Sequence, residues 1–212
     1  MLVLVGIPIG KAGDRAIGIA GTPALAAVAA VRAGAKVELV GKVGEDPSGD
    51  ALVLALGQAG IGHVALLRDP GHATPIVADH VSEDVIDGEQ STEAAPEAID
   101  RTSWPRLEAE DLQLALRYLP DVRAIVVAEP LPEAALRAVS EAASYLAAPL
   151  VVVAEPGTSP PADIVLAAPA SDPEGAFAEL LGQVGAALDR SVSVDEAFRD
   201  VSGRLGLSPA SS

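Results

Sequence analysis

The side chains of this chain that could carry chemistry are mostly carboxylates, and two of them stand together at Glu45 and Asp46, directly before Pro47. Acidic residues are favoured where a helix begins, because the helix dipole is positive there. We therefore interpret this pair as a turn whose negative charges complement the dipole of the helix that begins there. Glycines between residues 6 and 13 flank Lys11, but a phosphate-binding loop needs a Gly-Lys-Ser/Thr sequence that this segment lacks.

The residues that usually hold metals or act as nucleophiles are few. His63, His72 and His80 are the only histidines, and none has a second ligand four residues away on a helix, as zinc sites often do. The absence of cysteine excludes disulfides, thiolate metal sites and cysteine catalysis. Ser191 and Ser193 lack the Gly-x-Ser-x-Gly turn of serine hydrolases. The sequence predicts no metal centre and no nucleophilic side chain.

A third candidate is the segment 172–178, which reads Asp-Pro-Glu-Gly-Ala-Phe-Ala and introduces a helical pattern. Free backbone N–H groups at a helix N-terminus attract anions. Gly175 and Ala176 could therefore offer N–H groups to a small anion. The ring of Phe177 would crowd such a site, and packing of that ring into the core is the alternative interpretation.

The elements that must position these residues alternate between strands and helices. Expected strands are 2–8, 36–40, 64–67, 124–127, 150–154 and 163–166, and expected helices are 22–32, 46–58, 109–118, 132–146, 173–188 and 194–205. Such alternation is typical of a mostly parallel sheet flanked by helices in three layers. Thr22 is the expected N-cap of the first helix, with Pro23 as its first residue.

The interval 69–105 departs from this alternation. Strands are possible at 74–80 and 81–86, whereas 89–104 is polar and acidic, so we expect a surface flap. We predict one α/β domain over 1–207, with the flap as a small addition and 208–212 as a frayed tail.

Charge and hydropathy exclude several function classes. Fourteen basic against 30 acidic residues give a net charge of −16, which repels nucleic-acid phosphates. No apolar run reaches the roughly 18 residues that a membrane span requires, and no secretory signal stands at the start. We expect a cytoplasmic protein that binds neither nucleic acid nor membranes.

Three blocks in the first half resemble the ribokinase-like (PfkB) carbohydrate kinases: Ala-Gly-Thr-Pro-Ala-Leu-Ala-Ala at 20–27, Arg-Ala-Gly-Ala-Lys-Val at 32–37 and Gly-Lys-Val-Gly-Glu-Asp-Pro-Ser-Gly-Asp at 41–50. The resemblance implies a ribokinase-like fold and ATP- and Mg²⁺-dependent phosphorylation of a sugar or nucleoside. In the family a Gly-Gly pair, and an Asn four residues later, approach the sugar hydroxyls. Leu25 stands at the Asn position, and Ala20 replaces the first Gly. The vestigial sugar-binding residues implied here are Gly21, Thr22, Leu25, Gly41 and Lys42.

The segment 172–178 resembles the family's second motif, Asp-Thr-x-Gly-Ala-Gly-Asp, whose N–H groups form an anion hole and whose last Asp is the general base. In this chain Gly175, Ala176 and Phe177 correspond to the anion hole, and Ala178 stands at the base position. A methyl group accepts no proton, and Glu179 points about 100° further around the helix. The chain has no Asn, so the family's Asn-x-x-Glu element for Mg²⁺ and phosphate is missing, and the nucleotide-binding half is abbreviated.

These departures predict a homologue that has lost phosphotransfer, uses neither ATP nor Mg²⁺, and serves as a binding, regulatory or structural protein. A homodimer formed by strand pairing in the flap is expected. One alternative is a small sugar or nucleoside kinase with Asp172 or Asp46 as the base. Another is a module that binds a small anion or nucleoside without chemistry.

Overall fold

The central feature is a six-stranded parallel sheet. The computed structural model describes residues 1–13, 16–78, 103–172 and 174–204, the side chains of residues 202 and 204 excepted. The strands are β1 (Leu2–Val5), β4 (Val37–Gly44), β5 (Leu66–Asp69), β7 (Ala124–Val127), β8 (Leu150–Ala154) and β9 (Ile164–Ala167), in the order β5-β4-β1-β7-β8-β9. Every neighbouring pair is parallel.

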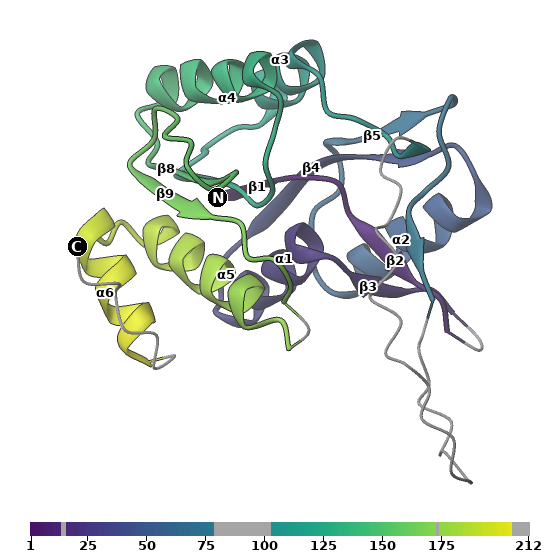
Figure 1. Cartoon of the computed structure of the whole chain (residues 1–212), viewed down its shortest axis with the longest axis horizontal. Coiled ribbons are helices and arrows are strands. Elements are labelled where there is room, and N and C mark those ends of the chain that lie inside the picture. Colours follow the sequence, from purple (N-terminus) through teal and green to yellow (C-terminus); the bar gives the residue numbers. More distant parts are fainter. Residues whose placement is uncertain (14–15, 79–102, 173, 205–212) are drawn as a thin grey trace, which may run out of the picture.

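Helices cover both faces of this sheet (Figure 1). One face carries α3 (Ala109–Tyr118) and α4 (Glu133–Leu146), and the other carries α1 (Thr22–Arg32) and α5 (Ala176–Asp189), with α6 (Val194–Arg204) packed on α5. The central strand β1 sends Leu2 and Leu4 into one apolar cluster and Val3 and Val5 into the other. A parallel sheet is stable when both faces are buried in this way. The predicted three-layer, ribokinase-like α/β fold is confirmed.

A second, three-stranded sheet stands beside the main one (Figure 1). It consists of β2 (Ile9–Lys11), β3 (Gly18–Ala20) and β6 (Ile76–Val77) in the order β3-β2-β6, with α2 (Pro47–Gln58) against β2 and β3. The segment between β1 and α1 therefore contains a hairpin, β2–β3, that the sequence did not predict. The two hairpin strands, β2 and β3, have three residues each and both contain glycine, so their apolar alternation is too short to detect in the sequence. The possible strand at 81–86, most of the expected flap and the tail at 208–212 lie outside the described residues.

Two helix starts differ from the expectation. The N-cap of α1 is Gly21, with φ of 75°, rather than Thr22, which is already the first helical residue. The helix α5 begins at Ala176 rather than at 173, because Gly175 adopts a left-handed conformation with φ of 71° that a right-handed helix cannot include. Within the described residues, no helix is long and apolar enough to cross a bilayer.

The helices α1 and α5 lie unusually close together. A Cβ at Gly182 of α5 would come within 2.6 Å of the Cβ of Ala29 in α1, so only glycine permits this approach. The close packing also brings the N-termini of the two helices to one cleft at the edge of the main sheet.

Candidate functional site

A cleft of about 480 Å³ lies outside the carboxyl ends of the central strands. The chain winds from β1 through β4 to β5 in one direction and then places β7, β8 and β9 on the other side of β1. Open parallel sheets bind ligands at such a reversal. The cleft is lined by Ile9, Gly21, Thr22, Pro23, Ala128, Glu129, Pro130, Val153, Glu155, Pro156, Ala168, Pro169, Ala170, Ser171, Asp172 and Phe177.

Three carboxylates reach this cleft from successive strand ends. Glu129 follows β7, Glu155 follows β8 and Asp172 follows β9. Glu129 Oε1 accepts a hydrogen bond of 2.6 Å from the N–H of Ile7, which joins the loops that follow β7 and β1. Thr22 and Ser171, which carry hydroxyl groups, line the same cleft as several prolines and Phe177. The cleft therefore combines hydrogen-bond acceptors with an apolar surface.

Asp172 occupies the N-terminus of α5. Its carboxylate accepts hydrogen bonds from the backbone N–H of Phe177, at 3.1 Å, and of Ala178, at 3.0 Å. The left-handed Gly175 turns the chain so that the carboxylate, five and six residues upstream, returns to these donors. The N–H groups that would otherwise attract an external anion are thus donated to the chain's own carboxylate.

Ala178 itself points away from the cleft. It is only 1% exposed and belongs to the apolar cluster that packs α5 against α1. The next acidic residue, Glu179, accepts a hydrogen bond of 2.6 Å from the Gln183 side chain one turn later. Neither position presents a carboxylate to the cleft.

The residues predicted from the sequence divide into two groups. Gly21, Thr22, Phe177 and Asp172 are brought together at the cleft, and Gly175 and Ala176 complete the start of α5 beside it. Three others are not among the described residues that line the cleft: Leu25, Gly41 and Lys42. Leu25 packs against the apolar cluster around α1.

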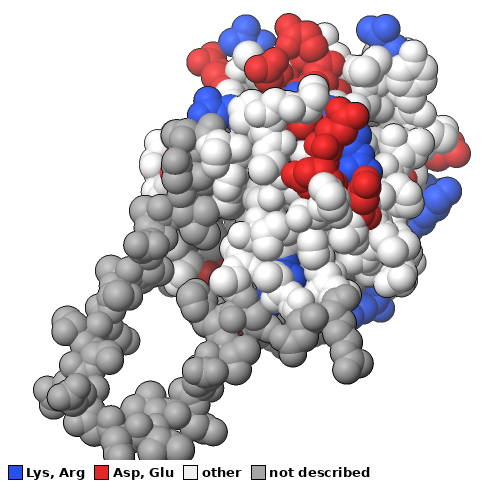
Figure 2. Space-filling model, turned by 90° about the vertical axis from the view of Figure 1, so that its right-hand side faces the viewer, with Lys and Arg blue, Asp and Glu red and all other residues white. Residues whose placement is uncertain are grey.

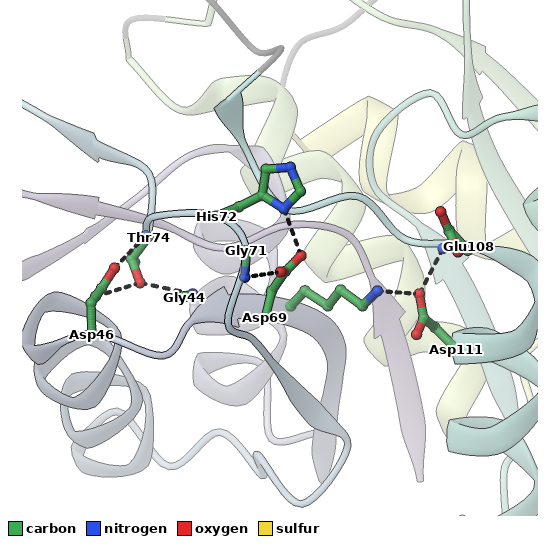
Figure 3. A network of polar contacts seen from close by, with 9 residues as sticks. Gly44, Asp46, Asp69, Gly71, His72, Thr74, Glu108 and Asp111 are labelled. Carbon is green, nitrogen blue, oxygen red and sulfur yellow. Dashed lines mark hydrogen bonds and ion pairs between the residues drawn. The ribbon is translucent and has the colours of Figure 1, made fainter.

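A separate polar network, which includes Asp69 and Asp111, lies at the ends of β4 and β5 and at the start of α3 (Figure 3). Lys42 joins it through Asp111. Its Nζ lies 2.6 Å from Asp111 Oδ2 of α3, and the Glu108 N–H donates to the same oxygen at 2.8 Å. Burial raises the pKa of Asp69, but the Gly71 N–H, the His72 side chain and the charge of Lys42 outweigh it and hold that pKa below its usual 3.8. The outer side near β5 and α2 likewise shows acidic and basic side chains next to one another (Figure 2).

Asp46 lies at the start of α2, as the sequence predicted, and the structure shows that it caps this helix. It is the N-cap of α2, and its Oδ1 accepts the Gly49 N–H at 2.7 Å. Thr74, in the segment before β6, donates its N–H to Oδ2 at 2.7 Å and its hydroxyl to Oδ1 at 2.9 Å. Burial raises the pKa of Asp46, but these hydrogen bonds outweigh it and lower the pKa below 3.8. Across the described residues, no three His, Asp or Glu side chains are grouped so that they could hold a metal ion.

Sequence reasoning missed Glu129 and Glu155. Each stands one or two residues after a buried strand that the sequence did predict, at 124–127 and 150–154. The carboxyl ends of parallel strands share one edge of the sheet, which is where ligands bind. An acidic residue directly after such a strand was therefore the signal that could have identified both.

Comparison with known proteins supports this fold. The family described as "pfkB family carbohydrate kinase" matches residues 7–167. A PfkB protein from Polaromonas sp. JS666 has a similar structure, with a TM-score of 0.62 and 15% identity over 98% of this chain and 96% of that one. The ribokinase of Arabidopsis thaliana, solved with ribose and ATP, gives a TM-score of 0.61 and 14% identity over 96% and 90%. No curated protein matches the sequence significantly. Because the family match covers most of the chain, the protein belongs to the pfkB family of carbohydrate kinases.

Proposed function

We propose that this protein binds a small polyhydroxylated molecule, a sugar or a nucleoside, in the cleft at the sheet edge and does not transfer phosphate. The observation that carries the proposal is the Asp172 carboxylate on the N–H groups of Phe177 and Ala178. By the family resemblance, these are the donors that would stabilise the transferred phosphoryl group.

A carboxylate at this place opposes phosphotransfer in two ways. It uses the donors that would meet the phosphoryl oxygens, and it places a negative charge where another negative charge would have to arrive. Among the described residues that line the cleft there is no Lys, Arg or His. The described lining therefore does not fit a nucleoside triphosphate with Mg²⁺, which the family would imply.

The base position adds a second obstacle. A carboxylate at residue 178 would enter the apolar packing between α5 and α1, where an unpaired charge is strongly disfavoured. A general base cannot be supplied there by a simple substitution. In this proposal the missing base is therefore a consequence of how α5 packs against α1, and restoring one carboxylate at residue 178 would not restore activity.

The cleft nevertheless retains features that suit a sugar or nucleoside. Its volume of about 480 Å³ falls within the usual range for small-molecule sites. Carboxylates such as Glu155, and the Thr22 hydroxyl, accept hydrogen bonds from ligand hydroxyls, while the Phe177 ring and the prolines offer an apolar surface to a sugar face. In this proposal the protein is a cytoplasmic binding or regulatory protein that acts as a homo-oligomer.

The competing proposal is a kinase in which Asp172 is the general base. It is favoured by one observation, the position of Asp172 on the cleft wall. Asp46, the other base considered, accepts three hydrogen bonds at the start of α2 and lies apart from the described cleft lining. Only Asp172 therefore remains as a candidate base.

A thermal-shift screen tests the proposal, with sugars and nucleosides offered singly and with ATP and Mg²⁺. A ligand that binds the folded state raises Tm by mass action. We expect a rise with at least one sugar or nucleoside and none with ATP and Mg²⁺ alone. Glu155→Gln should reduce the rise, whereas Glu110→Gln, on the exposed side of α3, should leave it unchanged. A rise with ATP, followed by transfer of its phosphate, would establish the competing kinase.

A further inference from the structure

The cleft at the sheet edge is rich in hydrogen-bond acceptors. Glu129, Glu155 and Asp172 contribute carboxylates to its lining, and the described lining contains no Lys, Arg or His. A carboxylate offers about four acceptor positions. Asp172 accepts two backbone N–H groups, so it retains acceptor positions for a ligand.

The same lining is poor in hydrogen-bond donors. The N–H groups of Ala128 and Ala168 are donated to the backbone of β1 and β8, and that of Phe177 is donated to the carboxylate at the start of α5. Thr22 and Ser171 add hydroxyls, which both donate and accept. A ligand that brings its own donors therefore suits this cleft better than one that brings acceptors. Four further lining residues are prolines, which have no N–H group: Pro23, Pro130, Pro156 and Pro169.

The acidic side chains of the cleft are not gathered at one point. In the part of the chain that the structure describes, no three His, Asp or Glu side chains are grouped closely enough to hold a metal ion. An organic molecule whose several polar groups reach separate acceptors fits this spacing better than a single ion does. A primary ammonium group carries three N–H donors and no acceptor. The ring of Phe177, in the same lining, is a further group that attracts cations.

We propose that the ligand of this cleft is a polyhydroxylated primary amine, that is, an amino sugar in its protonated form. Its ammonium group donates hydrogen bonds to carboxylates of the cleft, of which Glu155 and Asp172 form no ion pair with another described residue. The net charge of −16 attracts such a cation and repels sugar acids and sugar phosphates. The inference rests on the proposed function, which it narrows from sugars and nucleosides in general to one charged class.

Isothermal titration calorimetry at neutral pH tests this class of ligand. Glucosamine, galactosamine and mannosamine are each compared with their N-acetyl derivative and with the parent sugar, because acetylation removes the charge and keeps the ring hydroxyls. We expect at least one amine to bind with a Kd at least about tenfold below those of its two neutral counterparts, since hydrogen bonds to charged groups are the stronger ones. Ethylamine at the same ionic strength, an ammonium without hydroxyls, should not bind measurably.

A charge-removing variant locates the effect in the cleft. Glu155→Gln keeps an acceptor oxygen but removes the charge, so it should weaken binding of the amine and reduce its preference over the N-acetyl derivative. Glu110→Gln removes an equal charge from the exposed start of α3, away from the described cleft lining, and should leave both Kd values unchanged. Circular dichroism melting establishes that both variants are folded.

The outcomes separate this inference from the proposed function. A neutral sugar or a nucleoside that binds as tightly as the amines would overturn the inference and leave the proposed function in place. No binding of any sugar, nucleoside or amine would overturn both. Ethylamine that binds as tightly as the amino sugars, or equal weakening in Glu155→Gln and Glu110→Gln, would also overturn the inference, because the attraction would then come only from the net charge of the protein.

Discussion

Two helices, α2 and α5, begin at the carboxyl edge of the sheet, and each N-terminus holds an aspartate. In α2 the carboxylate belongs to the N-cap residue, Asp46, and bonds the N–H three residues later. In α5 the cap is Gly175, and the carboxylate of Asp172 arrives from the preceding loop. Both helices thus have a carboxylate hydrogen-bonded to their N-terminus. In α2 the carboxylate belongs to the cap residue itself, whereas in α5 it belongs to a residue in the preceding loop.

The surroundings of the two carboxylates also differ. Asp46 is tied to Thr74, a nearly buried residue 28 positions away, so it joins α2 to the segment that leads into β6. Asp172 is half-buried on the wall of the cleft. Asp46 therefore holds two segments of the fold together, whereas Asp172 lies at the cleft, where we propose that it occupies the place of a bound anion.

The largest effect is expected at α2. Asp46→Ala removes the cap and leaves the buried Thr74 hydroxyl without its acceptor, which should lower the free energy of unfolding by about 2–4 kcal/mol. Urea denaturation measures this loss. Asp50→Ala, which removes an exposed partner of Arg68 in the first turn of the same helix, should cost less than about 1 kcal/mol. Equal losses in the two variants would contradict the role assigned to Thr74.

Acid should weaken the same contacts. The pKa of Asp46 is lower in the folded protein than its usual 3.8, so folding favours the charged carboxylate. This contribution is complete above pH 3.8 and is lost as the pH falls below it, through the folded-state pKa. Asp69 contributes in the same direction. Stability measured from pH 5 down to pH 2 should fall less steeply in Asp46→Asn than in wild type, and parallel curves would contradict this expectation.

A smaller loss of stability, with a gain of binding, is expected at α5. Asp172→Ala frees the N–H groups of Phe177 and Ala178 and should cost about 1 kcal/mol. The freed N–H groups should then donate hydrogen bonds to inorganic phosphate, so added phosphate should raise Tm in this variant and leave the Tm of wild type unchanged. Asp195→Ala, in the first turn of α6, is the control. If wild type and Asp172→Ala respond equally to phosphate, Asp172 does not block the position.

The smallest effect is expected at Lys42. Its ion pair with Asp111 is only partly exposed, at 15% and 19%, so Lys42→Met should destabilise the protein by about 1 kcal/mol or less. Because Lys42 lies outside the described cleft lining, ligand-induced shifts of Tm should be unchanged. A smaller ligand-induced shift of Tm in this variant would indicate that Lys42 does belong to the binding site.

The two helix starts also show what the sequence can predict. The sequence predicted Asp46 at a helix start because acidic residues are favoured there, and its hydrogen bond from the Gly49 N–H, three residues later, is a local contact. The contact of Asp172 was not identifiable, because it depends on the left-handed turn at Gly175. The layers and most element bounds follow from apolar periodicity, whereas the hairpin β2–β3 is too short to show any. Glu129 and Glu155 line the same cleft because the strands that they follow, β7 and β8, are parallel neighbours in the sheet.

The most direct test is a phosphotransfer assay with γ-labelled ATP, Mg²⁺ and a panel of sugars and nucleosides. We predict that the wild-type protein forms no labelled product above a protein-free control, because the Asp172 carboxylate accepts the N–H groups of Phe177 and Ala178, which are the donors proposed for a phosphoryl group, and Ala178 provides no base. ATP-dependent labelling of any acceptor that disappears in Asp172→Asn would contradict this prediction and identify Asp172 as a catalytic base.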